Sequence, residues 1–330
     1  MSRICRKDAD LVFLIVGKSC NFNCSYCIQG DSHRVTDKVE ISPEVIDYLN
    51  GFHNRVTFYG GEPMLYFDQI KEILVKTRNS NNSYSLMTNG SLIRKSHIEF
   101  LNYFDVNLHV SWDGYNSRFS RYRDVMRENW GVLRFSNKLW IPSVIHSMNY
   151  PGDILEAANE LDEDYFSLHG YHLNVFLNPI IKRCENKIFD VDYSRIRNDI
   201  KKVIACPDTH VKQALLTYAY NSYVGWLGSD DYLYKCGHCI ALGLDGTVYQ
   251  CKNSDKVFGR IKDLDNWWNW QVAHDLNKNH DCVNCSVFPF CRGGCRILDK
   301  YQEEFCLLQK AFFEPLADWA KFKHEQREQL

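Results

Sequence analysis

The sequence lacks a long hydrophobic run and an excess of positive charge, and each absence excludes a class of protein. The first apolar stretch, LVFLIVG at residues 11–17, is too short for the h-region of a signal peptide and far too short to span a membrane. The net charge of −2 over 330 residues leaves no basic surplus to steer a nucleic acid onto the protein. We therefore expect a cytoplasmic protein whose partners include neither a membrane nor a nucleic acid.

Internal repeats and low-complexity segments are also missing. The length suits one large domain or two unequal ones, and contents of 45% hydrophobic and 24% charged residues are ordinary for a globular protein with a sizeable core. Cysteine, in contrast, is abundant, with 14 residues. Because cytoplasmic thiols stay reduced, this number indicates metal or redox chemistry rather than a disulfide framework.

The distribution of the cysteines predicts the domain organisation. Cys20, Cys24 and Cys27 lie close together near the N-terminus, and only Cys184 and Cys206 fall in the long middle of the chain. Eight more crowd the C-terminal part, at Cys236, Cys239, Cys251, Cys282, Cys285, Cys291, Cys295 and Cys306. The predicted units are a large domain over residues 1–200, a connecting helical region over 201–235, a cysteine-rich domain over 236–310 and a C-terminal helix over 311–330.

The large domain alternates segments typical of strands with segments typical of helices. The predicted strands are residues 11–17, 55–61, 84–89, 106–112, 142–148 and 171–177. The predicted helices between them include SPEVIDYLNGF, FDQIKEILVKT, SHIEFLNYF and PGDILEAANELDE, the first with Ser42 as cap and Pro43 at its first position. This alternation predicts an α/β fold with a parallel sheet, either open and doubly wound or a partial barrel. Cys20, Cys24 and Cys27 follow the first predicted strand, and the turn GGEP at residues 60–63 follows the second. Because chemistry in such sheets lies at the carboxyl ends of strands, this cysteine triplet and the GGEP turn should share one face.

The triplet has the spacing CxxxCxxC and follows the first predicted strand. By spacing alone it could be a zinc site or three buried thiols. It also resembles the signature of the radical S-adenosylmethionine (radical SAM) enzymes, in which three thiolates hold a [4Fe–4S] cluster and one iron is chelated by S-adenosylmethionine. The resemblance implies a partial (β/α)6 TIM-like barrel, and it places Tyr26 beside the adenine of that cofactor.

Further matches extend this resemblance over about residues 10 to 180. YGGEPML at residues 59–65 is similar to the GGE motif of the family, in which Gly60, Gly61 and Glu62 bind the methionine amine. Glycines there allow close approach of the backbone, and a carboxylate suits an ammonium group. MTNG and SWDG match the ends of the third and fourth strands. Three more residues that the resemblance assigns to the cofactor are Ser111, Arg123 and Asn149.

The C-terminal cysteines resemble the SPASM domain, an auxiliary-cluster module of radical SAM peptide-modifying and sulfatase-maturing enzymes. By that analogy Cys236, Cys239, Cys251 and Cys295 ligate one auxiliary cluster. Cys282, Cys285, Cys291 and Cys306 ligate a second, for three [4Fe–4S] clusters in all. LGLDGTVYQC is typical of a hairpin with Asp245 and Gly246 in its turn. A pair of zinc ribbons is the competing interpretation of these CxxC pairs.

The resemblance implies an oxidoreductase that cleaves S-adenosylmethionine reductively, with electrons from a donor such as flavodoxin or ferredoxin. The resulting 5′-deoxyadenosyl radical abstracts a hydrogen atom from a ribosomally made peptide, giving a crosslink, a thioether or an epimerised residue. The first alternative is sulfatase maturation. In those relatives an aspartate follows the cysteine that matches Cys251, whereas this sequence has Lys252. A zinc-stapled scaffold without enzymatic activity is the remaining hypothesis.

Two further features concern the substrate. An S–H bond is weak enough to give its hydrogen to a carbon radical, so Cys184 and Cys206 are candidate hydrogen donors. The predicted helix VKQALLTYAYNSYVGWLG carries several aromatic side chains, among them Tyr218, which would either pack in the core or form a wall for a peptide. Only about ten residues precede the first strand, so we expect no leader-binding domain there.

The three groups of cysteines predict the iron content. Eleven thiolates that hold three [4Fe–4S] clusters correspond to about twelve irons per chain after anaerobic reconstitution. Replacing Cys20, Cys24 and Cys27 by Ala should remove about a third of that iron and abolish cofactor cleavage. Elemental analysis that finds zinc and little iron in the reconstituted protein would contradict the whole assignment.

Overall fold

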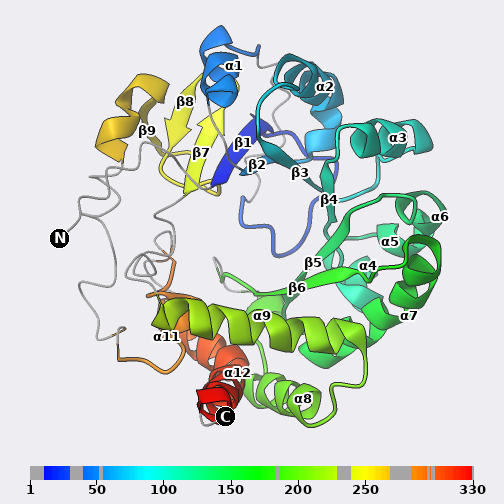
Figure 1. Cartoon of the computed structure of the whole chain (residues 1–330), viewed down its shortest axis with the longest axis vertical. Helices are drawn as coiled ribbons and strands as arrows, with labels where there is room; N and C mark the ends of the chain where they lie inside the picture. The colour runs from blue at the N-terminus through cyan, green and yellow to red at the C-terminus, as the bar shows by residue number, and fades with distance from the viewer. Residues whose placement is uncertain are drawn as a thin grey trace.

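The computed structural model describes residues 11–29, 40–51, 55–182, 186–228, 239–267, 282, 284–295, 298 and 302–328. The predictions for Cys184 and Cys236 lie outside these residues. Figure 1 shows the strands arranged in an arc, with most of the helices along its outer side. The sheet has nine strands in the order β6-β5-β4-β3-β2-β1-β7-β8-β9.

The first six strands form the predicted parallel sheet. Each strand from β1 to β5 pairs in parallel with the next one along the chain. Together with their curvature in Figure 1, this confirms the α/β partial barrel. The strands are β1 (Leu11–Gly17), β2 (Arg55–Gly60), β3 (Ser83–Thr88), β4 (Asn107–Val110), β5 (Leu139–Ile145) and β6 (Asn174–Pro179).

Helices return the chain between these strands close to the predicted positions. They are α1 (Pro43–Asn50), α2 (Phe67–Lys76), α3 (Lys95–Tyr103) and α7 (Pro151–His169). Ser42 precedes α1 with extended backbone as predicted, although its side chain makes no capping hydrogen bond. The connection from β4 to β5 consists of short elements, namely η3 (Gly114–Asn116), α4 (Ser117–Ser120), α5 (Val125–Glu128) and α6 (Trp130–Leu133).

The last two barrel strands differ from their predicted bounds by about three residues. β5 begins at Leu139, whereas the predicted strand begins at Pro142. Pairing between β4 and β5 extends only to Trp140, so the missing N–H of Pro142 costs no ladder bond on that side. Before β6, Gly170 ends α7 in the left-handed region at φ 73°, and Asp162 accepts a hydrogen bond from the Leu173 N–H. Residues 171–173 are therefore a connection rather than strand.

The C-terminal part of the chain continues the barrel sheet. β7 (Cys239–Gly243) pairs in parallel with β1, β8 (Thr247–Tyr249) pairs antiparallel with β7, and β9 (Val257–Arg260) pairs antiparallel with β8. The predicted hairpin is confirmed, since β7 and β8 pair around Gly246 at φ 85°, and Asp245 accepts a hydrogen bond from the Thr247 N–H. The parallel pairing of β7 with β1 places this hairpin beside the barrel strands.

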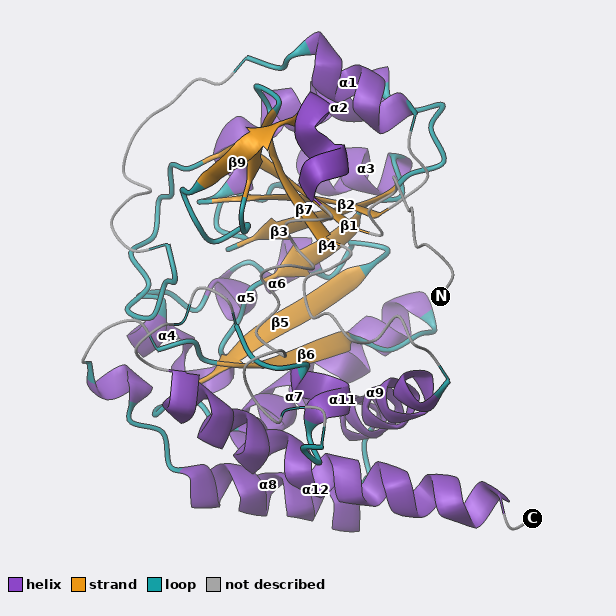
Figure 2. Ribbon diagram, turned by 90° about the vertical axis from the view of Figure 1, so that its left-hand side faces the viewer, coloured by secondary structure: helices purple, strands orange, loops and turns teal. Residues whose placement is uncertain are grey.

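A second helical layer lies at the other end of the arc, beside β6, as Figures 1 and 2 both show. α12 packs against α8 and α9, and its Glu314 forms an ion pair with Arg197 of α8 at 2.7 Å. Phe290 of α11 stacks on Phe313 of α12 with 4.8 Å between ring centroids. The elements are α8 (Tyr193–Ala205), α9 (His210–Leu227), α11 (Phe288–Cys291) and α12 (Gln302–Glu328).

α8 runs across residue 200, and α12 begins before residue 311. The boundaries predicted for the domains stay predictions. Within the described part of the chain, no helix combines the length and the apolar character that crossing a membrane requires.

Candidate functional site

A cavity of about 570 Å³ lies at the carboxyl ends of the barrel strands. The cysteine loop after β1 and the GGE turn after β2 form one side, together with residues that follow β3 and β4. Aromatic side chains of α9, α11 and α12 line the cavity as well, namely Tyr218, Phe290, Phe305 and Phe313. The predicted meeting of the triplet and the GGE turn on one face is therefore what the structure shows.

The three N-terminal cysteines line this cavity from one tight loop. The Cys27 N–H donates to the Cys24 carbonyl at 3.0 Å, and the Phe22 N–H donates to the Cys20 sulfur at 3.4 Å. A further backbone bond, from the Ser25 N–H to the Ser120 carbonyl at 3.0 Å, ties the loop to α4. The N–H donor at the Cys20 sulfur suits a thiolate, which carries negative charge.

Burial raises the pKa of the Cys20 thiol and that of the Cys24 thiol to about 11. Ionising these thiols therefore needs a strong positive partner such as iron. Among the described residues, no three His, Cys, Asp or Glu side chains are grouped closely enough to hold a single metal ion. A [4Fe–4S] cluster puts each thiolate on a separate iron, so three thiols on the wall of a roomy cavity fit a cluster.

Two glycines allow the GGE turn to pack directly on the cysteine loop. A Cβ at Gly61 would lie 2.3 Å from the Ser19 carbonyl oxygen, and one at Gly60, whose φ is 147°, would lie 2.0 Å from the Gly17 oxygen. In return, the Gly61 N–H donates to the Gly17 carbonyl at 3.1 Å, and the Glu62 N–H donates to the Ser19 carbonyl at 2.8 Å. Backbone contacts thus hold the two motifs in register.

The Glu62 carboxylate is buried and only partly satisfied by the protein. Its Oε1 accepts from the Met64 N–H at 2.9 Å and the Thr88 hydroxyl at 2.6 Å, and its Oε2 accepts from the Asn89 N–H at 2.7 Å. Burial raises the pKa of this carboxyl, and the three hydrogen bonds act in the opposite direction. A carboxylate has about four acceptor positions, so one on Oε2 is left toward the cavity that Glu62 lines.

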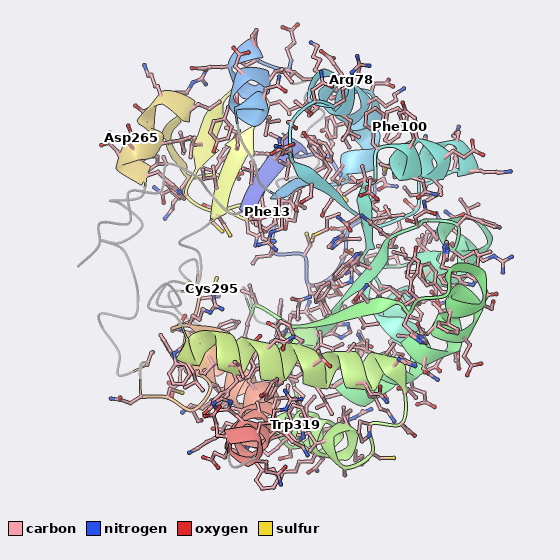
Figure 3. The ribbon with its side chains drawn as sticks, in the orientation of Figure 1. Phe13, Arg78, Phe100, Asp265, Cys295 and Trp319 are labelled. Atoms are coloured by element: carbon pink, nitrogen blue, oxygen red, sulfur yellow. The ribbon has the colours of Figure 1, made fainter. Side chains whose placement is uncertain are left out.

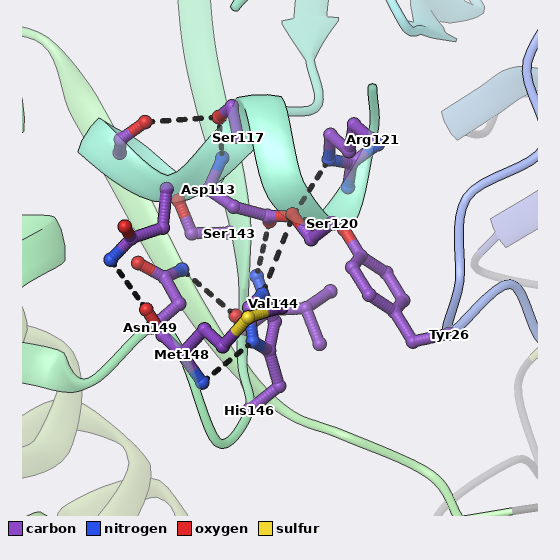
Figure 4. Close-up of polar contacts among 12 residues, drawn as sticks. Tyr26, Asp113, Ser117, Ser120, Arg121, Ser143, Val144, His146, Met148 and Asn149 are labelled. Atoms are coloured by element: carbon purple, nitrogen blue, oxygen red, sulfur yellow. Dashed lines mark hydrogen bonds and ion pairs between the residues drawn. The ribbon is translucent and has the colours of Figure 1, made fainter. Parts of the chain in front are cut away.

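Asp113 is the centre of a buried polar network beside the cysteine loop (Figure 4). Its Oδ2 accepts from the Tyr26 hydroxyl at 2.5 Å, the Ser120 hydroxyl at 2.7 Å and Arg121 Nε at 3.0 Å. The Arg121 guanidinium also lies over the Tyr26 ring, 5.3 Å from its centroid. His146 accepts from the Met148 N–H on Nδ1 and directs its Nε2 at Asp113, 3.7 Å away.

This network fixes the charges of its members. Burial acts to raise the pKa of Asp113, but the Arg121 charge, the nearby His146 ring and the hydrogen bond from Ser120 outweigh it and hold that pKa well below its usual range. The pKa of Arg121 is raised, because Asp113 outweighs the effect of burial. Burial likewise raises the pKa of Tyr26. The fixed ion pair of Asp113 and Arg121 therefore lies against Tyr26, the residue before Cys27.

The structure brings most of the predicted cofactor residues to the cavity but not all of them. Tyr26, Gly60, Gly61, Glu62 and Ser111 line it. Arg123 and Asn149 do not line it.

Arg123 is exposed and paired with Glu128 at 2.5 Å, and Arg121 lines the cavity in its place. The sequence RYR offers both arginines, and only burial distinguishes them. Asn149 is fully buried outside the lining and donates to the Val144 carbonyl. Cys206 is exposed at the end of α8 and lines a separate crevice between α7 and α8.

Seven of the eight C-terminal cysteines are described, and none of them is in a disulfide. The Asn253 N–H donates to the Cys251 sulfur at 3.4 Å, as the Phe22 N–H does to Cys20. The Cys285 N–H donates to the Cys282 carbonyl at 3.0 Å in a turn like that between Cys24 and Cys27. The ligand sets of the two auxiliary clusters stay predictions.

The Asp113–Arg121 pair predicts which of the two arginine ion pairs stabilises the fold. Asp113→Asn leaves a buried guanidinium unpaired, so we expect the free energy of unfolding to fall by about 3–5 kcal/mol. Arg123→Ala removes only an exposed pair and should cost less than about 1 kcal/mol. Urea unfolding at neutral pH measures both, and similar losses in the two variants would contradict this assignment.

The same pair predicts a dependence on pH. Because the pKa of Asp113 is depressed in the folded protein, its stabilisation is complete above the unfolded value of about 4 and is lost as the pH falls further. The difference between the wild type and Asp113→Asn should thus be constant from pH 7 down to about pH 5. A difference that already disappears by pH 5 would show that Asp113 is not held ionised.

Comparison with known proteins agrees with this geometry. Residues 14–136 match the model of the Radical SAM superfamily. The radical SAM cyclopropyl synthase TigE of Paramaledivibacter caminithermalis is 25% identical over 86% of this chain, and the match spans 66% of TigE. A cysteine-type anaerobic sulfatase-maturating enzyme of Clostridium perfringens is also 25% identical, over 89% of this chain and 92% of that enzyme.

The fold extends beyond the superfamily match. The solved structure of native anSMEcpe with bound AdoMet superposes with a TM-score of 0.68 at 21% identity, over 94% of this chain and 99% of that one. The same protein with AdoMet and the Cp18Cys peptide gives a TM-score of 0.67. The matched segment contains the cysteine loop, the GGE turn, Asp113 and Arg121, so residues 14–136 of this chain form a radical SAM domain.

Proposed function

We propose that this chain is a radical SAM enzyme that modifies a ribosomally synthesised peptide. The observation that carries the proposal is a single cavity that joins the cysteine loop to aromatic side chains of the C-terminal helices. One wall has the donors that a cluster and S-adenosylmethionine need, and Tyr218, Phe290 and Phe305 offer apolar surface to a larger substrate.

The residues of the first wall have separate roles. Cys20, Cys24 and Cys27 hold the cluster, and Glu62 accepts the methionine ammonium on the acceptor position that its own hydrogen bonds leave. When bound, the cluster and S-adenosylmethionine supply a carbon radical that takes a hydrogen atom from the substrate. Tyr26, fixed by Asp113, forms a rigid apolar side of the site.

A peptide substrate is supported by the aromatic wall and by the relatives. Tyr218 of α9 lines the cavity and is 48% exposed, so its aromatic ring is accessible to a substrate. anSMEcpe has been solved with the Cp18Cys peptide, and TigE is a cyclopropyl synthase. We assign the reaction to the class in which a substrate radical is oxidised, because the eight C-terminal cysteines would hold clusters able to take its electron.

Two auxiliary [4Fe–4S] clusters complete the proposed enzyme, and a small electron-transfer protein such as flavodoxin or ferredoxin reduces it.

Sulfatase maturation is the second candidate, favoured by the similarity to the Clostridium perfringens enzyme over most of both chains. Lys252 lines the cavity directly after Cys251, at the position where the resemblance predicts an aspartate for that activity. A cation there does not suit removal of a proton from a neutral group, so peptide modification is the first choice.

The role of Glu62 can be tested by cofactor binding. Glu62→Gln should weaken S-adenosylmethionine binding by about tenfold or more, because the ammonium loses its charged acceptor. Iron content should stay near the wild-type value, since backbone bonds at Gly61 and residue 62 hold the cysteine loop. Calorimetry on the anaerobically reconstituted protein measures the affinity, with Glu128→Gln, an exposed carboxylate, as control. Unchanged affinity in Glu62→Gln would contradict the role.

The fate of the substrate radical can be read from the mass of the product. With a precursor peptide encoded near the gene, oxidation by an auxiliary cluster gives a product lighter than the substrate by two hydrogens. Quenching by a thiol instead leaves the mass unchanged in ordinary water and raises it by one unit in deuterated water. The measurement is made on the wild type, Cys184→Ala and Cys206→Ala. Solvent deuterium at a product Cα, lost in one variant, would overturn the oxidation assignment.

A further inference from the structure

A lysine after the C-terminal hairpin faces the same cavity as the cysteine loop. Lys252 stands in a turn in which the Asn253 N–H donates to the Cys251 sulfur and the Ser254 N–H donates to the Cys251 carbonyl at 3.0 Å. The Tyr59 hydroxyl, on β2, donates to Asn253 Oδ1 at 2.7 Å. The turn is thus anchored both to the barrel and to a cysteine of the C-terminal group.

Two aromatic rings, rather than an acid, hold the Lys252 ammonium. Its Nζ lies 4.4 Å from the ring centroid of Phe13 and 4.4 Å from that of Tyr59. Phe13 points from β1 toward the inner side of the arc of strands (Figure 3). No carboxylate within the described part of the chain forms an ion pair with Lys252. Aromatic faces position an ammonium but leave its three N–H donors without acceptors.

The other charged side chains of the cavity wall differ from Lys252. Glu62 is an acceptor that the proposed function assigns to the methionine ammonium, and Arg121 is paired with the buried Asp113. A second lysine nearby provides the contrast. Lys18, which lines a small neighbouring pocket together with Lys252, is neutralised by Asp255 at 2.7 Å. Within the described residues, Lys252 therefore contributes the uncompensated positive charge of the cavity wall.

The place of Lys252 in the chain indicates what this charge serves. The match to the superfamily covers residues 14–136, which hold the cysteine loop and the GGE turn, and Lys252 lies outside it. Lys252 comes from the C-terminal extension, which also supplies the aromatic wall of the cavity through Phe290, Phe305 and Phe313. A residue from this part of the chain is positioned to recognise the substrate rather than the shared cofactor.

We propose that Lys252 binds a carboxylate of the peptide substrate, an aspartate or glutamate side chain or the C-terminus, next to the residue that is modified. The proposal rests on the proposed function and adds a substrate class to it, namely a peptide with an acidic group near the modified residue. Phe13 and Tyr59 hold the ammonium in place before the substrate arrives, which lowers the entropy lost on binding. A charge-assisted hydrogen bond then fixes the register of the peptide.

The experiment uses the anaerobically reconstituted holoenzyme with S-adenosylmethionine, immobilised and exposed to a display library of short random peptides. The wild type should enrich Asp and Glu at one position of the selected peptides. Lys252→Met should lose this preference, and Lys252→Glu should replace it with a preference for Lys and Arg. Lys18→Met, a lysine whose charge is already paired, should keep the wild-type preference.

A selected peptide and its Asp→Asn or Glu→Gln analogue then give the size of the effect. The acidic peptide should bind Lys252→Met at least about tenfold more weakly than the wild type, whereas the amide analogue should bind both proteins alike. S-adenosylmethionine affinity and iron content should be the same in Lys252→Met as in the wild type. A loss of cofactor affinity would assign the charge to the cofactor carboxylate, and a loss of iron would assign it to an auxiliary cluster. Either loss would overturn the proposal.

The remaining outcomes separate this proposal from the proposed function. Enriched peptides without an acidic preference, or a preference that survives in Lys252→Met, would overturn the role of Lys252 and leave peptide modification standing. Failure of the wild-type holoenzyme to enrich any peptide would contradict the peptide substrate itself, and the role of Lys252 with it.

Discussion

Parallel pairing of β1 on both of its edges is the constraint on which the site depends. β2 pairs with one edge, so the GGE turn ends beside the cysteine loop that follows β1. β7 pairs with the other edge, and the hairpin that it begins carries Cys251 and Lys252 back to the same cavity. Parallel strands present their carboxyl ends at one edge of a sheet, so the first two segments meet there. The third segment follows the antiparallel β8 and reaches the cavity by placing Lys252 over the rings of Phe13 and Tyr59.

Charge inside the site is handled in two different ways. Asp113 and Arg121 are buried as a pair and neutralise one another, so they stabilise the wall behind Tyr26 and offer little to a ligand. Glu62 and Lys252 retain capacity for a ligand, one through an open acceptor position and the other through an ammonium that only aromatic rings contact. The first arrangement supplies rigidity and the second supplies recognition.

The C-terminal part of the chain contributes to the fold as well as to the site. β7 and β8 extend the barrel sheet, and α12 packs on α8 and α9 next to β6. The cavity therefore lies between the strand ends and helices that are far away in sequence. This arrangement, with rigid walls on two sides, suits a reaction in which a radical must meet a single substrate atom.

The sequence by itself determined the elements and the motifs. Alternating apolar runs predicted β1 to β4 within one or two residues. The spacing of Cys20, Cys24 and Cys27, together with the GGE turn, predicted one site at one sheet edge. These features depend on local periodicity and on short-range turn chemistry, which neighbouring residues encode.

Only the tertiary structure decided which polar residues face the cavity. Arg121 and Arg123 are two positions apart in a short segment, and burial against Asp113 selects the first. Asn149 and Cys206 were predicted as candidate site residues, yet Asn149 is fully buried outside the cavity lining and Cys206 is exposed at the end of α8. The parallel pairing of β7 with β1, which makes Lys252 part of the site, joins segments more than two hundred residues apart. Such contacts arise from long-range packing, and no local pattern in the chain encodes them.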